Sequence, residues 1–218
     1  MKNHFELIVF DWDGTLMDSA GAIARAIQFA CRDMGLPAPS DERARHVIGL
    51  GLQEALAYVA PGLKHEDYPR MVDCYRRHYL TIDHDLMLFD GAFELVESLA
   101  EEGRLLGVAT GKGRKGLDRA FAASGLGTFF HASRCADECF SKPHPEMLEQ
   151  LMDTFGVDRS RTLMIGDTTH DLAMAENAGV QAVGVGYGAH LRAALEEAQT
   201  LAVVDSIADL SVWLRENA

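Results

Sequence analysis

Two aspartates follow a short apolar run near the start of the chain. Leu7–Phe10 is unbroken apolar sequence, typical of a strand buried on both faces of a parallel sheet, and Asp11 and Asp13 come where it would end. Ligands of open α/β sheets bind beyond the carboxyl ends of the strands. Two carboxylates this close repel each other, so ionising both is costly without a cation. The alternative for this stretch alone is an Asp-Gly turn with two solvated acids.

Further polar residues follow later apolar stretches in the same way. Thr110 and Gly111 follow the second predicted strand, and Asp167 follows the fourth, with Asp171 four residues later. Lys142 lies in a proline-containing loop that can reach the same edge. Any one of these is a weak signal by itself. Because parallel strands end at one edge of a sheet, we expect these groups to converge on a single site.

Alternating strand and helix patterns from residue 90 onward predict the fold class. Strands that alternate with helices form right-handed βαβ units, with helices on both faces of a parallel sheet. We therefore expect an α/β fold with a doubly wound, Rossmann-like core. The predicted strands cover residues 7–10, 105–109, 129–133, 162–165, 181–185 and 202–204.

The region between residues 17 and 88 shows helical spacing and no convincing strand alternation. Its first helix is expected to be capped by Asp18 or Ser19. About 70 residues of helix are too long for a crossover connection, so the sequence predicts an inserted α-helical cap domain. We assign residues 1–16 and 86–218 to the core and residues 17–85 to the cap.

Composition excludes several classes of partner. The chain has 218 residues and a formal net charge of −13, which disfavours nucleic acid and anionic membranes as partners. An anionic substrate would need a locally positive or metal-bearing site. No apolar run approaches the roughly 20 residues that cross a bilayer, and the N-terminus does not have the pattern of a signal peptide. We expect a cytoplasmic protein.

The four cysteines do not indicate a disulfide scaffold or a clear metal site. None forms a CxxC pair. A zinc site formed by His131, Cys135, Cys139 and His144 can be imagined, but structural zinc ligands usually come in tighter pairs across a loop. We disfavour it.

With these residues placed, the chain resembles the haloacid dehalogenase-like superfamily. The resemblance rests on DWDGT at residues 11–15, Thr110, Lys142 in KPHP, and GDTTHD at residues 166–171. It covers the whole chain, because this family also inserts a helical cap after its first motif. The arrangement is most similar to the phosphoglycolate phosphatase and β-phosphoglucomutase branch. Asp90, where relatives commonly have proline, and Leu50, where phosphoglycolate phosphatases often have asparagine, depart from the pattern.

The two aspartates of the first motif are the expected catalytic residues. A covalent aspartyl-phosphate splits a very slow hydrolysis into two easier steps. Asp11, first after the strand, is the expected nucleophile. Asp13 is the expected general acid, and its closeness to Asp11 would favour a proton-bearing form.

The resemblance assigns the remaining polar residues to charge stabilisation. It implies Mg²⁺ held by the Asp11 carboxylate, the Asp13 backbone carbonyl and Asp167, with Asp171 in support. Asp171 is equally well interpreted as a first-turn helix acid. Phosphoryl oxygens would be bound by Thr110, Gly111 and Lys142.

The cap is expected to choose the substrate. Arg45, Gly49, Leu50 and Gly51 form the loop most suited to reach the site, since glycines permit close backbone approach. The alternative is a plain helix end at these glycines. We interpret His170 as a solvated loop histidine.

Taken together, the sequence predicts an Mg²⁺-dependent phosphatase acting on a small phosphorylated metabolite, and the family resemblance implies a phosphoglycolate-like substrate. A β-phosphoglucomutase-like phosphomutase shares every core motif and is the alternative enzyme. A non-catalytic phosphate-responsive module is the alternative from another class, although receiver modules are about half this length and lack a cap. We expect a monomer or homodimer that binds neither nucleic acid nor membrane.

Overall fold

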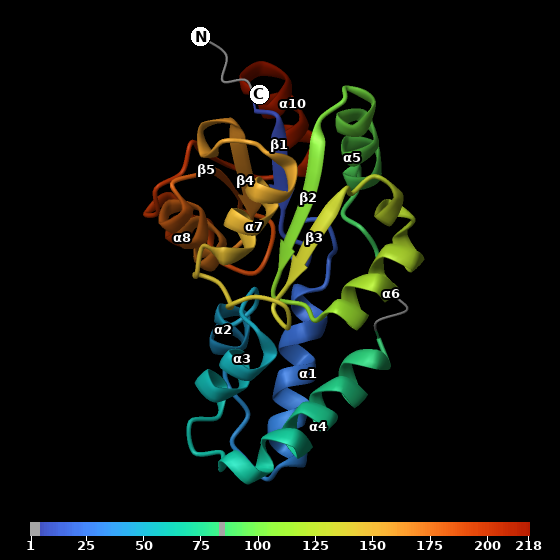
Figure 1. Cartoon of the computed structure of the whole chain (residues 1–218). Helices are drawn as coiled ribbons and strands as arrows, with labels where there is room; N and C mark the ends of the chain where they lie inside the picture. Colours follow the sequence, from blue (N-terminus) through green and yellow to red (C-terminus); the bar gives the residue numbers. More distant parts are fainter. Residues whose placement is uncertain (1–4, 83–85) are drawn as a thin grey trace.

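A computed structural model describes residues 5–82 and 86–218 of the chain (Figure 1). Six parallel strands in this part of the chain form one sheet in the order β3-β2-β1-β4-β5-β6, which is the Rossmann-like order expected for a doubly wound fold. The strands are β1 Leu7–Phe10, β2 Leu105–Thr110, β3 Ala132–Cys135, β4 Thr162–Gly166, β5 Gln181–Val185 and β6 Ala202–Val204.

Helices cover both faces of this sheet, and a second group of helices lies beyond the carboxyl ends of its strands (Figure 1). The second group is α1 Ala20–Asp33, α2 Asp41–His46, α3 Leu52–Val59 and α4 Tyr68–Leu80. The sheet is covered by α5 Ala92–Glu101, α6 Arg114–Ser124, α7 Glu146–Phe155, α8 Thr169–Ala178, α9 Arg192–Glu196 and α10 Ile207–Asn217. Short 3₁₀ turns occur at His65–Asp67, Leu126–Thr128 and Arg159–Arg161.

The alternation of side chains along β1 explains why both faces of the sheet are covered. Ile8 and Phe10 belong to the cluster that packs with α5, α6 and α10, whereas Leu7 and Val9 belong to the cluster that packs with α7, α8 and α9. All four side chains are fully buried. The unbroken apolar run is therefore a central strand, as predicted.

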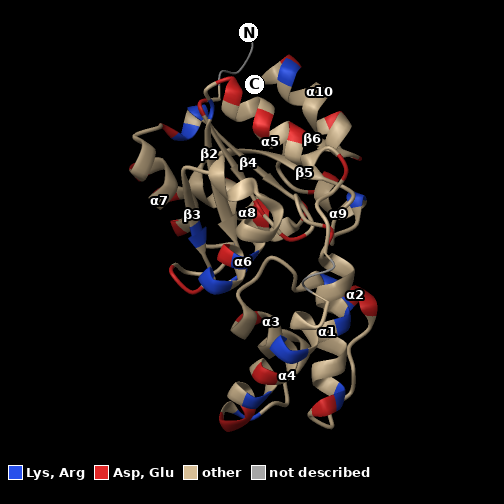
Figure 2. Cartoon of the chain, turned by 90° about the vertical axis from the view of Figure 1, so that its right-hand side faces the viewer, with Lys and Arg blue, Asp and Glu red and all other residues tan. Residues whose placement is uncertain are grey.

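Helices α1 to α4 pack around a separate hydrophobic cluster, built from residues such as Ile27, Leu56 and Met71, which Ala189 of the loop after β5 also joins. The two segments that join them to the sheet pair with each other, since Phe89 N–H donates to Leu16 O and Asp18 N–H donates to Met87 O. Figure 2 shows acidic and basic residues together on α2 and α4. We call helices α1 to α4 the cap and the sheet with its covering helices the core. Their division at residues 17–85 stays a proposal that this separate packing supports.

The third strand differs from the prediction. It covers Ala132–Cys135 rather than residues 129–133, because Phe129 and Phe130 anchor the preceding turn. Their rings pack edge-on against Phe93 and Phe10, so their apolar character reflects core contacts and not a strand. In the described residues, no helix is long and apolar enough to cross a membrane.

Candidate active site

The structure brings the predicted polar residues to one edge of the sheet. Asp11 and Asp13 follow β1, Thr110 ends β2, and Asp167 follows β4. Lys142 comes from the loop between β3 and α7. Residues more than 130 positions apart in the chain thus surround one point, where the sheet meets the cap.

Lys142 is the cation at the centre of this cluster. Its side chain is fully buried, and Nζ donates to Asp11 Oδ1 at 2.8 Å and to Asp171 Oδ1 at 2.6 Å. Burial alone would lower the pKa of Lys142, but the charges of Asp11 and Asp171 outweigh it and the pKa is raised. Lys142 is therefore a fixed positive charge and not a solvated surface lysine.

Three buried carboxylates surround that single ammonium. Oxygens of Asp11, Asp167 and Asp171 lie within 4.8 Å of one another. Burial raises the pKa of Asp11 to about 7; the Lys142 charge opposes this and the Asp171 charge adds to it. Burial, and then the charges of Asp11 and Asp171, raise the pKa of Asp167 well above its ordinary value. With all groups ionised, three carboxylates and one lysine leave two uncompensated negative charges.

The donor atoms fit a hard divalent cation. Asp11 Oδ2 is buried and has no hydrogen-bond partner among the described residues. Asp167 is oriented by Thr15 Oγ1, which donates to Oδ1 at 2.9 Å, and by the Ala189 N–H, which donates to Oδ2 at 2.7 Å. Each of these oxygens keeps a further lone pair. An all-oxygen, doubly negative cluster has the chemistry that Mg²⁺ prefers.

Asp171 is an acidic residue in the first turn of α8, which was the alternative to its expected support of the metal site. Thr168 and Asp171 form a capping box at the start of α8: Thr168 N–H donates to Asp171 Oδ2 at 3.0 Å, and Asp171 N–H donates to Thr168 Oγ1 at 3.3 Å. Its other oxygen accepts from Lys142. Asp171 therefore joins the helix start to the charge cluster.

Asp13 contacts groups that sequence reasoning did not assign to it. Ser19 Oγ donates to Asp13 Oδ1 at 2.7 Å, and Lys112 Nζ lies 2.9 Å from Asp13 Oδ2. The same Lys112 ammonium donates to Tyr79 Oη of α4 at 3.1 Å. Ser19 occupies the start of α1, as expected, but its hydroxyl orients Asp13 instead of capping the helix. Asp13 is thus connected to the cap on two sides.

Thr110 and Gly111 lie where β2 ends. Thr110 is buried, and its hydroxyl oxygen accepts from the Lys112 N–H at 3.1 Å, which leaves the hydroxyl hydrogen for another acceptor. A Cβ at Gly111 would lie 2.5 Å from the carbonyl oxygens of Gly49 and Leu50. Glycine at this position therefore allows the cap loop to approach the core backbone closely.

The loop at residues 49–51 lies on the core, whereas Arg45, the fourth predicted cap residue, pairs within its own helix. Gly51 N–H donates to Ser141 Oγ at 2.7 Å, and a Cβ at Gly49 would contact Thr168 Oγ1. Leu50 is half-buried and packs with the cap cluster. Arg45 pairs with Asp41 of its own helix. Three of the four predicted cap residues thus belong to the segment that contacts the core.

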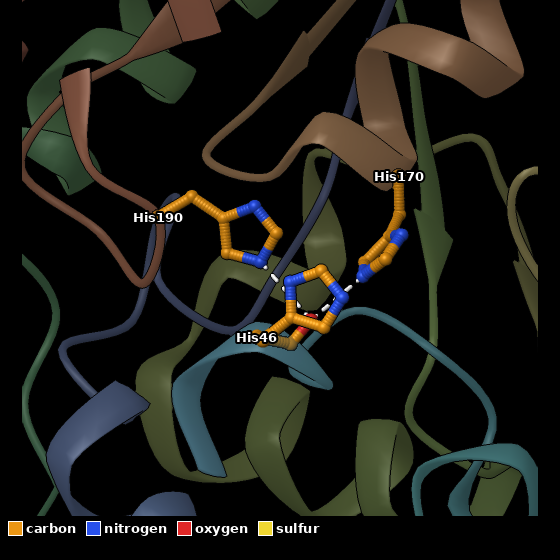
Figure 3. Close-up of side chains that lie close together, drawn as sticks. All are labelled: His46, His170 and His190. Carbon is orange, nitrogen blue, oxygen red and sulfur yellow. Dashed lines mark hydrogen bonds between the residues drawn. The ribbon is translucent and has the colours of Figure 1, made fainter. Parts of the chain in front are cut away.

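His170 differs from its interpretation as a solvated loop residue. It lies in the first turn of α8, half-buried, beside His46 of α2 and His190 of the loop after β5 (Figure 3). Burial lowers the pKa of His170; burial and then the neighbouring His170 lower that of His190 to about 4.

The disfavoured zinc set is not assembled. The groups of three or more metal-ligating side chains found among the described residues are the acidic cluster and the three histidines. Neither group contains His131, Cys135, Cys139 or His144, the residues of the disfavoured zinc set.

Sequence reasoning missed the residues that orient the charged groups. Thr15, Ser19 and Thr168 are buried hydroxyl residues, and all three bond to an aspartate of the site. Their only signal is a position within a few residues of the motif aspartates. That signal does not distinguish them from ordinary helix-capping residues.

Comparison with known proteins agrees with this geometry. Residues 8–185 match the family model described as "Haloacid dehalogenase-like hydrolase". A protein named "Probable phosphatase IndB" from Dickeya dadantii is 35% identical over 94% of this chain and 91% of its own length. A phosphoglycolate phosphatase from Pectobacterium atrosepticum is 31% identical over 93% of this chain and 89% of its own length.

A solved structure agrees over nearly the whole chain. The crystal structure of a hydrolase from Pseudomonas syringae superposes with a TM-score of 0.89 at 25% identity, covering 98% of this chain and 99% of that one. Cap and core are both included in this likeness. The chain therefore belongs to the haloacid dehalogenase-like hydrolase family, as an enzyme of its phosphoglycolate phosphatase-like branch.

Proposed function

We propose that this chain is an Mg²⁺-dependent phosphatase that hydrolyses a small phosphate monoester through an aspartyl-phosphate on Asp11. The observation that carries the proposal is the Asp11 carboxylate. Lys142 holds one of its oxygens, and the other is buried without a hydrogen-bond partner in the described residues. A carboxylate oxygen oriented in this way, beside a fixed cation, is suited to attack phosphorus. Similarity to the phosphoglycolate phosphatase from Pectobacterium supports a phosphoglycolate-like substrate.

The first half-reaction transfers the phosphoryl group to the protein. One oxygen of the Asp11 carboxylate forms a bond to phosphorus while the bond from phosphorus to the leaving oxygen breaks. Asp13 gives a proton to that oxygen, so the alcohol leaves neutral. Lys142, the Thr110 hydroxyl and the Gly111 N–H stabilise the phosphoryl oxygens. At ~4 Å and an effective dielectric near 20, one Lys–phosphate pair contributes about 4 kcal/mol.

The second half-reaction releases phosphate. Asp13 draws a proton from a water molecule, whose oxygen attacks phosphorus as the bond to Asp11 breaks. Lys112 Nζ, 2.9 Å from Asp13 Oδ2, holds this carboxyl group in position. Inorganic phosphate leaves and Asp11 is regenerated. A cap resting on the core excludes other water from the acyl-phosphate.

Asp11, Asp167 and the Asp13 backbone carbonyl would hold Mg²⁺, with Asp171 in support through Lys142. When bound, the ion would neutralise the two excess charges of the cluster and stabilise negative charge on the phosphoryl oxygens. We further propose that residues 49–51 contact the leaving group and that the enzyme acts in the cytoplasm.

Asp11→Asn tests the covalent step. An amide keeps the size of the carboxylate but lacks its nucleophilic charge, so we expect kcat on a phosphate-ester panel to fall more than a hundredfold. Losses of about 10²–10⁴ are typical of proton transfer alone. Acid-quenched single-turnover reactions should show a phosphoenzyme in the wild type only. Asp153→Asn, at an exposed position of α7, is the matched control and should retain full activity.

Two results would contradict the proposal. An Asp11→Asn variant with more than about a hundredth of the wild-type rate would exclude Asp11 as the nucleophile. Transfer of the phosphoryl group back to a sugar phosphate, without release of phosphate, would favour the phosphomutase alternative.

A further inference from the structure

Three histidines from separate segments meet where the cap touches the core. His46 ends α2 of the cap, whereas His170 and His190 belong to the core (Figure 3). Their ring centroids lie 5.2 to 5.4 Å apart, and each ring offers one nitrogen such that these atoms all lie within 4.8 Å of one another. The mechanism proposed above uses none of these rings.

The nitrogens of two rings converge on one point. His170 Nε2 lies 2.7 Å from the His46 carbonyl oxygen, and His190 Nε2 lies 3.1 Å from the same oxygen (Figure 3). An imidazole nitrogen directs a hydrogen bond and a metal bond along the same direction in the ring plane. A cation bound by both Nε2 atoms would therefore take the place that the His46 carbonyl oxygen now occupies, and this oxygen would have to turn aside. The His46 ring, which lies parallel to the His190 ring with 7° between their planes, would have to rotate to direct a nitrogen at the same ion.

A neighbouring threonine provides the partner that a ligating histidine requires. Metal-binding imidazoles almost always donate their other N–H to an oxygen. His190 Nδ1 lies 3.3 Å from Thr169 Oγ1 and now accepts from the Thr169 N–H at 3.1 Å. Moving the proton of His190 from Nε2 to Nδ1 would free Nε2 and direct the new N–H at the Thr169 hydroxyl, and the Thr169 N–H that now donates to Nδ1 would have to turn to another acceptor. No net proton need be released.

We propose that His46, His170 and His190 form a binding site for a transition metal ion, with Zn²⁺ the expected occupant, that ties the cap to the core. Imidazole nitrogens suit Zn²⁺, whereas Mg²⁺ prefers oxygen ligands, so this site and the acidic cluster select different ions. Three histidines leave a fourth position of Zn²⁺ open. Because the ligands come from both cap and core, a bound ion opposes separation of α2 from α8. The proposal does not depend on the proposed phosphatase reaction.

Isothermal titration of the full chain with Zn²⁺, in excess Mg²⁺ to occupy the acidic cluster, tests this site. We expect one Zn²⁺ per chain in the wild type. Removing even an outer-shell partner typically costs about 10–100-fold in metal affinity, so His46→Gln and His190→Gln should each weaken binding at least about tenfold. His65→Gln is the matched control: His65 is also a cap histidine, exposed and outside the cluster, and its loss should change nothing.

Two further measurements make the outcome decisive. Visible absorption of Co²⁺ bound in place of Zn²⁺ should show a nitrogen-ligated, four-coordinate ion, and His190→Gln should abolish that spectrum. Asp11→Asn should retain wild-type Zn²⁺ affinity, which separates this site from the proposed catalytic one. Equal Zn²⁺ affinity in the wild type, His46→Gln and His190→Gln, with circular dichroism confirming folded variants, would overturn the proposal. So would Zn²⁺ binding that Asp11→Asn removes.

Discussion

The acidic cluster is surrounded by glycines because its carboxylates leave no room for side chains. A Cβ at Gly14, Gly188 or Gly166 would overlap the carboxyl groups of Asp167 or Asp171. Gly14 also has φ +88°, which side chains rarely adopt. The glycine of the first motif thus serves two purposes: it turns the chain after Asp13 and makes space for Asp167.

Gly14→Ala should therefore lower the free energy of unfolding by more than the strain of a left-handed backbone alone, because the added Cβ also displaces Asp167. The left-handed conformation costs roughly 1–2 kcal/mol with a side chain, and overpacking adds about 1–3 kcal/mol. Gly35→Ala is the control, since Gly35 has φ +71° and nothing within 4 Å of an added Cβ. Urea unfolding should show a larger loss for Gly14→Ala, and Mg²⁺ should stabilise only the Gly35→Ala variant to the wild-type extent. Equal losses would mean that Asp167 moves away at no cost.

The sequence pattern was sufficient to predict which charged residues meet, but it was insufficient to predict the residues that orient them. Asp11, Asp167 and Lys142 could be predicted to meet, because each follows an element whose end lies at the same sheet edge. The contacts of Ser19 and Lys112 with Asp13 could not, because they depend on how α1 and α4 sit against the core. Hydroxyl and lysine residues near a motif are too common to single out.

Among the elements, the loop at residues 49–51 links the cap most directly to the phosphate end of the site. Its backbone lies against Gly111 and Ser141, close to the groups expected to bind the phosphoryl oxygens. Its close approach was expected from its glycines, but its contacts with Gly111 and Ser141 could not be predicted. The third strand was displaced for a similar reason, because Phe129 and Phe130 fill the core from a turn.

Leu50→Lys and Lys142→Ala should have different effects on one ester panel. Leu50 is expected to contact the leaving group, so its change should reorder preference among esters and spare a small activated ester such as p-nitrophenyl phosphate. Lys142, which contacts Asp11, is expected to act on the phosphoryl group common to all esters, so its loss should lower every kcat/KM. For each variant and each ester, the ratio of wild-type to variant kcat/KM gives the loss of transition-state stabilisation. Parallel losses would place Leu50 with the core machinery, and no effect of Leu50 would make the loop a plain helix end.

The loop that carries His190 should make stability sensitive to mild acid. The pKa of His190 falls from 6.5 in a model compound to about 4 in the fold. As pH falls from about 6.5 to 4, the unfolded chain therefore binds a proton that the native state does not, and stability is lost. A shift of this size corresponds to at most about 3 kcal/mol. With EDTA present, His190→Gln should reduce the loss of unfolding free energy between these pH values; an identical loss would contradict burial of a neutral His190.

At the scale of the whole molecule, the apolar cluster of the cap includes Ala189 of the core, and polar and charged side chains make further contacts between the two parts. Buried apolar residues hold each part together, whereas Lys112, Ser19 and the three histidines lie between them. The fold class could be predicted, because apolar periodicity determines it, and the separate packing of α1 to α4 supports the predicted cap insertion. The contact between the parts could not, since it combines side chains from segments far apart in the chain.

The uncompensated charge of the acidic cluster should make stability depend jointly on Mg²⁺ and pH. The pKa of Asp11 rises from 3.8 to about 7 in the metal-free fold. Between these values the native state binds more protons than the unfolded chain, so stability of the metal-free protein falls as pH rises through this window. Mg²⁺ needs the ionised carboxylate, so its apparent affinity should rise up to tenfold per pH unit and level off above about pH 7.

The measurement is the increase in melting temperature caused by saturating Mg²⁺, compared with EDTA, at a series of pH values. The increase should be small near pH 5 and largest above pH 7, because ligand stabilisation grows with the ratio of ligand concentration to Kd. Asp11→Asn removes the titrating ligand, so its Mg²⁺ response should be weaker and flatter with pH. Asp153→Asn, which keeps the cluster, should follow the wild type. A wild-type Mg²⁺ response of equal size at pH 5 and pH 8 would show that proton and metal do not compete for Asp11, and the ion would then have to bind elsewhere.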